Sequence, residues 1–106
     1  MKNIQLTCAH ALVKFLIAQK TLIDGKKEPL FPGVFGIFGH GNVACLGQAL
    51  QENQKKLPTW RGHHEQNMAL TGIAYSRAKR RKQIFVATSS VGPGSTNMIT
   101  AAAVAM

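Results

Sequence analysis

Two short apolar runs, each followed by a loop of glycine and small polar residues, constrain the fold of this chain more than any other feature. They occupy residues 34–38 (VFGIF) and 84–88 (IFVAT). Uncharged runs of this length predict strands that are buried on both faces, as in a parallel sheet. Because segments of helical periodicity alternate with them, the sequence predicts an open α/β fold with right-handed crossovers. Ligand-binding loops in such folds follow the carboxyl ends of the strands.

The segments around these runs carry helical and turn patterns. Helices are expected at residues 8–20, 43–56 and 65–82, and in an alanine-rich stretch that is still helical at Met106. Thr7 and Asn42 are the expected N-caps of the first two helices. A weak strand is expected at residues 58–61. Residues 23–33, which contain Asp24-Gly25 and two prolines, are expected to form a turn or an irregular connector.

Length and composition limit the chain to one small domain. It has 106 residues, of which 45% are hydrophobic, which is enough for a core. Cys8 and Cys45 are far apart and outside any CxxC spacing, so we expect reduced, buried thiols in a cytoplasmic protein. No membrane span is expected, because Gly92-Pro93-Gly94 interrupts the uncharged C-terminal stretch. Since the alanine-rich helix reaches Met106 without a cap or a polar tail, residues 1–106 are expected to be the N-terminal portion of a longer protein.

The net charge and the spacing of the glycines leave two alternative functions open, nucleic-acid binding and nicotinamide binding. The formal net charge of +9 suits nucleic acid or an anionic cofactor. No aromatic residues interleave with the basic residues of segment 77–82, so a solvated helix end is favoured over a nucleic-acid surface. Gly39-x-Gly41-x-x-Ala44 matches the short dinucleotide fingerprint, which makes a nicotinamide-binding domain a second alternative.

The acidic residues narrow the search for a catalytic group. The only carboxylates are those of Asp24, Glu28, Glu52 and Glu65. Glu65 alone lies in the first turn of a helix that follows a predicted strand, where α/β proteins place functional groups. Its charge either complements the helix dipole or takes part in chemistry. The loop at 89–97 (SSVGPGSTN) is likewise either an ordinary helix-capping turn or a set of backbone N–H groups for a polar ligand.

Three sequence blocks resemble the signatures of the thiamine-diphosphate-dependent enzymes. They are HEQNMA at residues 64–69, GIAYSR at 72–77 and TSSVGPGSTN at 88–97. The blocks lie in the order found in that family, and the similarity extends from about Thr7 to the end of the chain. The resemblance implies a three-layer parallel α/β domain that binds the pyrimidine ring of the cofactor, the PYR domain, present here only in part.

The resemblance also implies which residues form the site. Glu65 is similar to the carboxyl that bonds the pyrimidine N1′ and promotes proton removal from thiamine diphosphate. A buried carboxyl with a raised pKa would suit this role. His40 is implied as an acid/base or hydroxyl-binding residue near the substrate. The implied cofactor-binding residues, besides Glu65, are Gly92, Pro93, Gly94 and Asn97.

The sequence departs from the family's pattern at one turn. Phe38 stands where the family's G-x-P-G turn has proline. Of the adjacent pair His63 and His64, only His64 is expected to face the cofactor region, because neighbours on a strand point to opposite sides. No metal-ligating residue is expected in this chain. The family holds the diphosphate and Mg²⁺ on a separate domain with a G-D-G…N signature, which this sequence lacks.

Residues 35–43 (FGIFGHGNV) look most similar to a subfamily of C–C hydrolases of inositol breakdown. The resemblance implies that the longer protein opens a cyclic 1,2-diketone to a deoxy sugar acid, and that this chain alone is inactive. It also implies a homo-oligomer, a dimer or tetramer, whose sites form between the PYR domain of one subunit and the diphosphate-binding domain of another. An acetolactate-synthase-like carboligase or decarboxylase is the alternative within the family. Neither nucleic acid nor a membrane is an expected partner.

Overall fold

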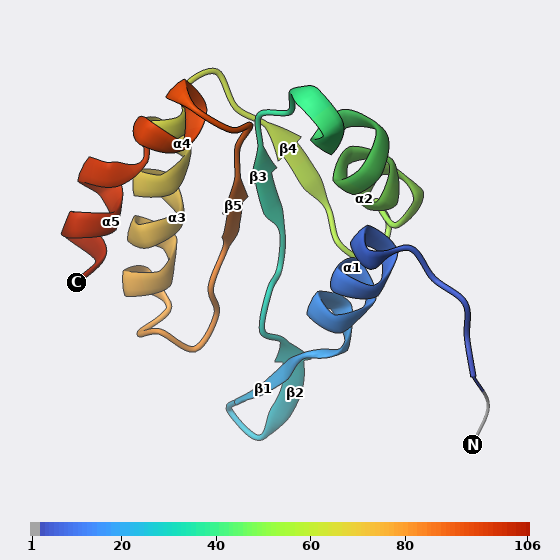
Figure 1. Ribbon diagram of the computed structural model, residues 1–106. Helices are drawn as coiled ribbons and strands as arrows, with labels where there is room; N and C mark the ends of the chain where they lie inside the picture. Colours follow the sequence, from blue (N-terminus) through green and yellow to red (C-terminus); the bar gives the residue numbers. More distant parts are fainter. Residues whose placement is uncertain (1–2) are drawn as a thin grey trace.

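The computed structural model describes residues 3–106, apart from the side chain of His40, and contains a parallel sheet flanked by helices (Figure 1). Its strands are β3 (Val34–Gly36), β4 (Thr59–Arg61) and β5 (Val86–Thr88), in the spatial order β4-β3-β5. The central strand β3 pairs in parallel with both neighbours, so that Val34 lies opposite Thr59 and Val86. The predicted α/β fold with a parallel sheet is therefore confirmed.

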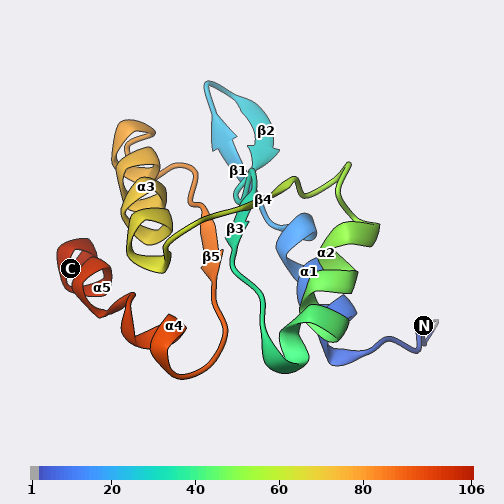
Figure 2. The same ribbon diagram turned by 90° about the horizontal axis from the view of Figure 1, so that it is seen from above.

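Helices cover both faces of this sheet, as Figure 2 shows. Helices α1 (Cys8–Ala18) and α2 (Gln48–Glu52) lie on one side, and α3 (Glu65–Ala78) and α5 (Ile99–Ala105) lie on the other. The buried core cluster joins α1 and α2 to the sheet and consists of Val13, Val34, Ala49, Leu50 and Leu57. Burying a side chain of this size contributes about 1.5–3 kcal/mol, so this cluster is a major source of stability.

The first helix forms where the sequence predicts it. The Thr7 hydroxyl caps α1 by accepting a hydrogen bond from the backbone N–H of His10 at 3.1 Å. Cys8 lies in the first turn of α1 and Cys45 lies in the segment before α2, and both are exposed. The prediction of buried thiols is wrong, because both residues face away from the core cluster.

Residues 20–29 form a hairpin, so the turn expected within residues 23–33 is present, but two paired strands flank it. Strands β1 (Lys20–Ile23) and β2 (Lys26–Pro29) pair antiparallel. Asp24 and Gly25 make the turn with φ angles of 52° and 79°. Two residues with positive φ match the right-handed twist of the flanking strands, which explains why Asp-Gly is a strong hairpin signal.

The second predicted helix is regular only in part. A 3₁₀ turn (His40–Asn42) leads into a π-helical segment (Val43–Gly47), and α2 has only five residues. A Cβ at Gly47 would stand 3.1 Å from the carbonyl oxygen of Asn42, so the backbone approaches itself closely here. The prediction that Asn42 caps this helix is wrong, because its side-chain amide instead donates to the carbonyl oxygen of Ser89 at 3.1 Å.

The remaining helices are shorter than predicted. Helix α3 ends at Ala78, and Arg80 and Arg81 follow it with φ angles of 53° and 64°. Arg81 N–H donates to the Ser76 carbonyl at 2.7 Å, which closes the helix in a Schellman-type turn. The alanine-rich segment is divided into α4 (Pro93–Thr96) and α5. Within residues 3–106, no helix is both long and apolar enough to cross a membrane.

Candidate functional site

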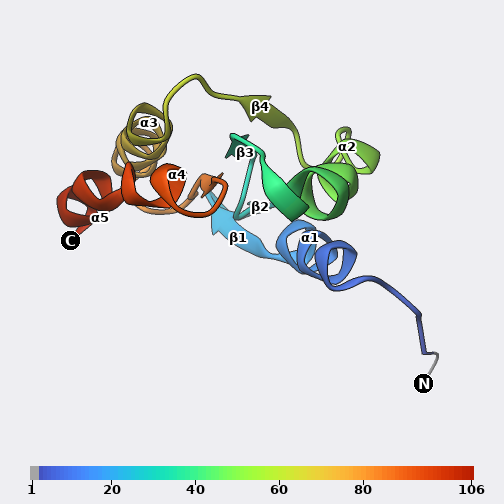
Figure 3. The same ribbon diagram turned by 45° about the horizontal axis from the view of Figure 1, so that its top comes forward.

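The loops that follow the parallel strands lie at one end of the sheet, where β5 leads into α4 and β4 leads into α3 (Figure 3). The loops after β3 and β5 are in direct contact. The Asn42 amide donates to the Ser89 carbonyl, and a Cβ at Gly39 would stand 3.0 Å from the Cβ of Ser90. This is the end at which α/β folds place their ligands.

Glu65 is the first residue of α3, and its carboxyl group reaches the loop after β5. The His64 imidazole caps the helix, since its Nδ1 accepts from the backbone N–H of Gln66 at 3.2 Å. Glu65 Oε2 accepts a hydrogen bond from Asn97 Nδ2 at 3.2 Å. A Cβ at Gly94 would stand 3.2 Å from Glu65 Oε1. The structure thus brings together three of the predicted site residues, Glu65, Gly94 and Asn97.

Gly92 and Pro93 shape the turn that carries Gly94. Gly92 has φ 71° and ψ −123°, a conformation that side chains disfavour. Pro93 begins α4, where the lack of an N–H costs nothing. Both residues are exposed.

The surroundings of Glu65 favour its ionised form. Its own backbone N–H, and then the Asn97 amide, lower the pKa of the Glu65 carboxyl, while desolvation acts in the opposite direction and nearby His64 lowers the pKa further. The side chain is only half-buried. Hydrogen-bond donors therefore determine the direction of the shift in this chain, and the raised pKa expected for a carboxyl buried beside an apolar ring stays a prediction.

The predicted histidines contribute less to this cluster. The backbone of His40 lies in the 3₁₀ turn after β3, but its side chain is outside the described part of the structure, so its role stays a prediction. His63 and His64 are both exposed, and His64 is occupied in capping α3. Within the described residues, no group of three or more His, Cys, Asp and Glu side chains could hold a metal ion.

Sequence reasoning missed two residues that join the loops, Asn42 and Ser90. Asn42 was predicted as a helix cap, and only the folded contact with Ser89 shows its other partner. The Ser90 side chain lies against both Gly39 and Gly94. No local sequence pattern predicts such contacts, because the two residues in each contact lie far apart in the sequence.

The glycine loop after β3 does not form the phosphate cradle of a dinucleotide-binding fold. Gly39 is extended, with φ −170°, and the loop enters the 3₁₀ and π-helical segments described above. A dinucleotide fingerprint needs the N-terminus of a regular α-helix directly after its glycines.

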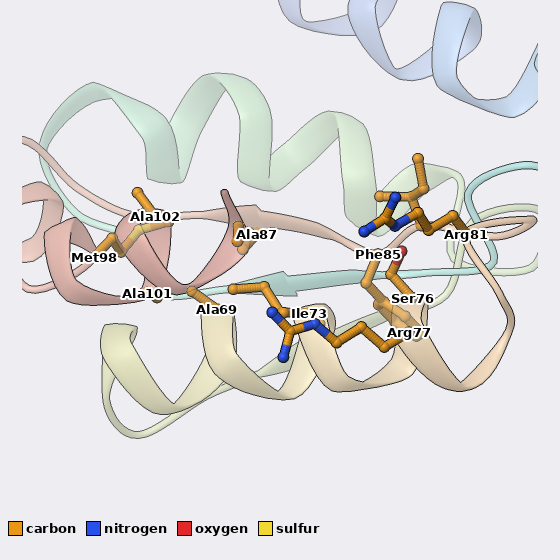
Figure 4. A pocket seen from close by; sticks show the side chains of 13 residues that line it. Ala69, Ile73, Ser76, Arg77, Arg81, Phe85, Ala87, Met98, Ala101 and Ala102 are labelled. Atoms are coloured by element: carbon orange, nitrogen blue, oxygen red, sulfur yellow. The ribbon is translucent and has the colours of Figure 1, made fainter.

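An apolar cavity lies between α3, β5 and α5 (Figure 4). This cavity of about 330 Å³ is lined mainly by apolar side chains, such as Ile73, Phe85 and Met98. Arg77 and Arg81 also line it, and Arg77 Nη2 donates to the Val104 carbonyl at 2.9 Å. No residue of the Glu65 cluster lines this cavity, and it contains no carboxylate, histidine or thiol.

Comparison with known proteins identifies the family. Residues 18–106 match the family described as thiamine pyrophosphate enzyme, N-terminal TPP binding domain. Since the match covers most of the chain, the protein belongs to this family, as the sequence blocks predict.

Among individual relatives, the chain is 54% identical over 105 residues to 3D-(3,5/4)-trihydroxycyclohexane-1,2-dione hydrolase of Geobacillus thermodenitrificans. It is 52% identical to proteins of the same name from Bacillus thuringiensis and Bacillus anthracis. Each alignment covers 99% of this chain but only 16% of the relative. The predicted similarity to a cyclic-diketone hydrolase is confirmed.

Proposed function

We propose that residues 1–106 form the N-terminal portion of the PYR domain of a longer thiamine-diphosphate-dependent enzyme. The proposed reaction is hydrolytic C–C cleavage of trihydroxycyclohexane-1,2-dione to an open-chain deoxy sugar acid, in cytoplasmic inositol breakdown. Family membership and 54% identity to a hydrolase of that name support the proposal. The observation that carries it is the cluster of Glu65, Gly94 and Asn97 beyond the carboxyl ends of the strands.

The tight packing at Gly94 supports the proposal. A side chain at this position would crowd both Ser90 Oγ, at 3.0 Å, and Glu65 Oε1, at 3.2 Å, so glycine allows the loop after β5 to approach the carboxyl group closely. In the proposed site, Glu65 would hold the aminopyrimidine ring through its N1′, and the turn formed by Gly92, Pro93 and Gly94 would lie beside the ring. When bound, thiamine diphosphate would supply a nucleophilic carbon for cleavage next to a carbonyl group.

The rest of the proposed active site lies outside these 106 residues. We assign the diphosphate and Mg²⁺ to another domain of the longer protein, and we assign completion of the site to a second subunit. His40, on the loop after β3, is the proposed acid/base or hydroxyl-binding residue for the substrate. A small cyclic diketone is the proposed substrate, and no nucleic acid or membrane takes part.

The test uses the full-length protein with the matched variants Glu65→Gln and Glu52→Gln. Glu52 is also a hydrogen-bonded glutamate, but its partners are His10 and Gln48 on α1 and α2. We expect kcat for the cyclic diketone to fall by roughly 10²-fold or more in E65Q, the range for loss of acid–base catalysis. E52Q is expected to keep its activity.

Two results would contradict the proposal. Full activity of E65Q would remove Glu65 from the chemistry. Turnover of pyruvate without turnover of the diketone would show that the longer protein is a carboligase or decarboxylase of the same family and not the proposed hydrolase.

A further inference from the structure

The two oxygens of the Glu65 carboxyl group have different surroundings. Oε2 accepts the hydrogen bond from Asn97 Nδ2 at 3.2 Å. Oε1 faces Gly94, where a Cβ would stand 3.2 Å away. Among the described residues, Asn97 provides the side-chain hydrogen bond to this carboxyl group, so Oε2 is engaged within the chain, whereas Oε1 has no side-chain hydrogen bond there.

We propose that Asn97 is a positioning residue for Glu65 and not a ligand of the cofactor. Its amide holds Oε2 and leaves Oε1 for the pyrimidine nitrogen. This inference rests on the proposed function, because it assigns a task to Asn97 only where Glu65 meets an aminopyrimidine.

The turn before Asn97 is well ordered by hydrogen bonds. Thr96 N–H donates to the Gly92 carbonyl and Asn97 N–H donates to the Pro93 carbonyl, each at 3.0 Å. The Ser95 hydroxyl donates to the Ser90 carbonyl at 3.0 Å. Asn97 follows the last residue of α4, at the break before α5, and these bonds fix its backbone. Its side chain is thereby directed at α3 from an element 32 residues away in sequence.

The chemistry of an amide suits this task. A side-chain NH₂ group can only donate, so at Oε2 it restricts any proton of the carboxyl group to Oε1, where the proton can be shared with the pyrimidine nitrogen. The lowered pKa of Glu65 agrees with this arrangement, although the backbone N–H of Glu65 is the larger cause. Among the described side chains, His64 is the charged neighbour that acts on Glu65, and His63 and Arg61 precede it in the chain. The loop after β5 brings only uncharged residues to the carboxyl group.

The experiment compares Asn97→Ala, Asn97→Asp and Asn97→Ser in the full-length protein. Asn53→Ala serves as the matched control, because the Asn53 amide also donates one hydrogen bond, to the Ala49 carbonyl at 2.8 Å, at the end of α2. Two quantities are measured from about pH 3.5 to pH 8, a range that extends below the usual pKa of a glutamate: the Kd of thiamine diphosphate by calorimetry, and kcat.

We expect N97A to weaken cofactor binding by roughly tenfold, the effect of losing one hydrogen bond to a charged group. The acid-side midpoint of the pH dependence should rise by about one unit. N97D should show a larger effect, because it places a second carboxylate beside Glu65. N97S keeps a donor and should recover part of the loss, while N53A should match the wild-type protein.

Unchanged Kd and pH dependence in N97A and N97D would overturn the inference. An equal loss at every pH in N97A, N97D and N97S, together with a lower melting temperature, would show a structural role and also overturn it. The E65Q variant separates the two proposals. If E65Q is inactive and the Asn97 variants are normal, only the positioning role fails, whereas an active E65Q removes the proposed function itself.

Discussion

At the residue scale, two glycines of the candidate site have different physical reasons to be glycine. Gly92 adopts a positive φ of 71°, which costs a residue with a side chain about 1–3 kcal/mol. Gly94 has an ordinary φ, but it is buried against Ser90 and Glu65. Gly41 meets neither condition, since a Cβ there would contact nothing within 4 Å. Alanine substitutions at these three positions would separate the effect of backbone strain, at Gly92, from that of crowding, at Gly94, and from that of a side chain added in open space, at Gly41.

We expect Gly94→Ala to weaken thiamine diphosphate binding by the full-length protein by about tenfold or more. The added methyl group would stand 3.0 Å from Ser90 Oγ and 3.2 Å from Glu65 Oε1, so one of these groups must move. Such crowding typically costs about 1–3 kcal/mol. Gly41→Ala is the control and should leave both the Kd and the melting temperature unchanged. Equal Kd values for the two variants would show that Gly94 does not border the cofactor.

The candidate site was predictable from sequence only through short motifs. Glu65, Gly94 and Asn97 belong to blocks that resemble a known family, and the structure brings these residues together. The direction of the Glu65 pKa shift was not predictable, because it depends on which donors tertiary packing places beside the carboxyl group. Asn42 was missed for the same reason, since its partner Ser89 lies 47 residues away.

At the scale of elements, a surface hydrogen-bond chain joins α1 to α2. Thr7 Oγ1 lies 2.7 Å from His10 Nδ1, and His10 Nε2 lies 2.6 Å from Glu52 Oε2. The hydrogen bond from His10, and then that from Gln48, lower the pKa of Glu52. This contact helps to hold a helix of only five residues, which would not be stable alone.

We expect Glu52→Gln to lower the stability of the chain near neutral pH but not in acid. A group whose pKa is lowered in the folded state stabilises the fold above its unfolded pKa, about 4.3 for glutamate, and this stability is lost as the pH falls through the folded value. The difference in melting temperature between E52Q and wild type should therefore be present at about pH 7 and vanish by about pH 3.

Glu28→Gln is the control for this experiment, because Glu28 has no ion pair among residues 3–106. Circular dichroism melting curves of the two variants and the wild-type chain give the comparison. A difference between E52Q and wild type that does not depend on pH would mean that the carboxylate charge contributes nothing.

Elements with a strong local signal were predicted well, and those shaped by distant contacts were not. The central strand and α1 follow from apolar periodicity and a Thr cap. The β1–β2 hairpin also has a local signal, Asp24-Gly25, but two prolines and the charges around it suggested an irregular segment. The π-helical segment at Val43–Gly47 arises where the loop after β3 contacts the loop after β5, which periodicity alone does not show.

At the scale of the whole molecule, the sheet remains open at both sides. In the described part of the chain, β4 and β5 each pair only with β3, so no strand covers their outer edges, although the Gln54 side chain bonds the N–H and C=O of Thr59 on β4. The cavity of about 330 Å³ beside β5 is mainly apolar, and Trp60 on β4 is 48% exposed. Open edges next to apolar surface favour association with further polypeptide.

We therefore expect the isolated 106-residue chain to associate in a concentration-dependent manner, or to be only marginally stable. Ala102→Lys places a charge in the apolar cavity, whereas Ala103, its neighbour on α5, does not line the cavity. Sedimentation velocity should show that A102K shifts the chain towards monomer, because burial of an unpaired charge is costly, and that A103K does not. A monomer with a sharp, concentration-independent thermal transition would show that the sheet edges and the cavity need no covering, and that these residues are sufficient for a stable fold.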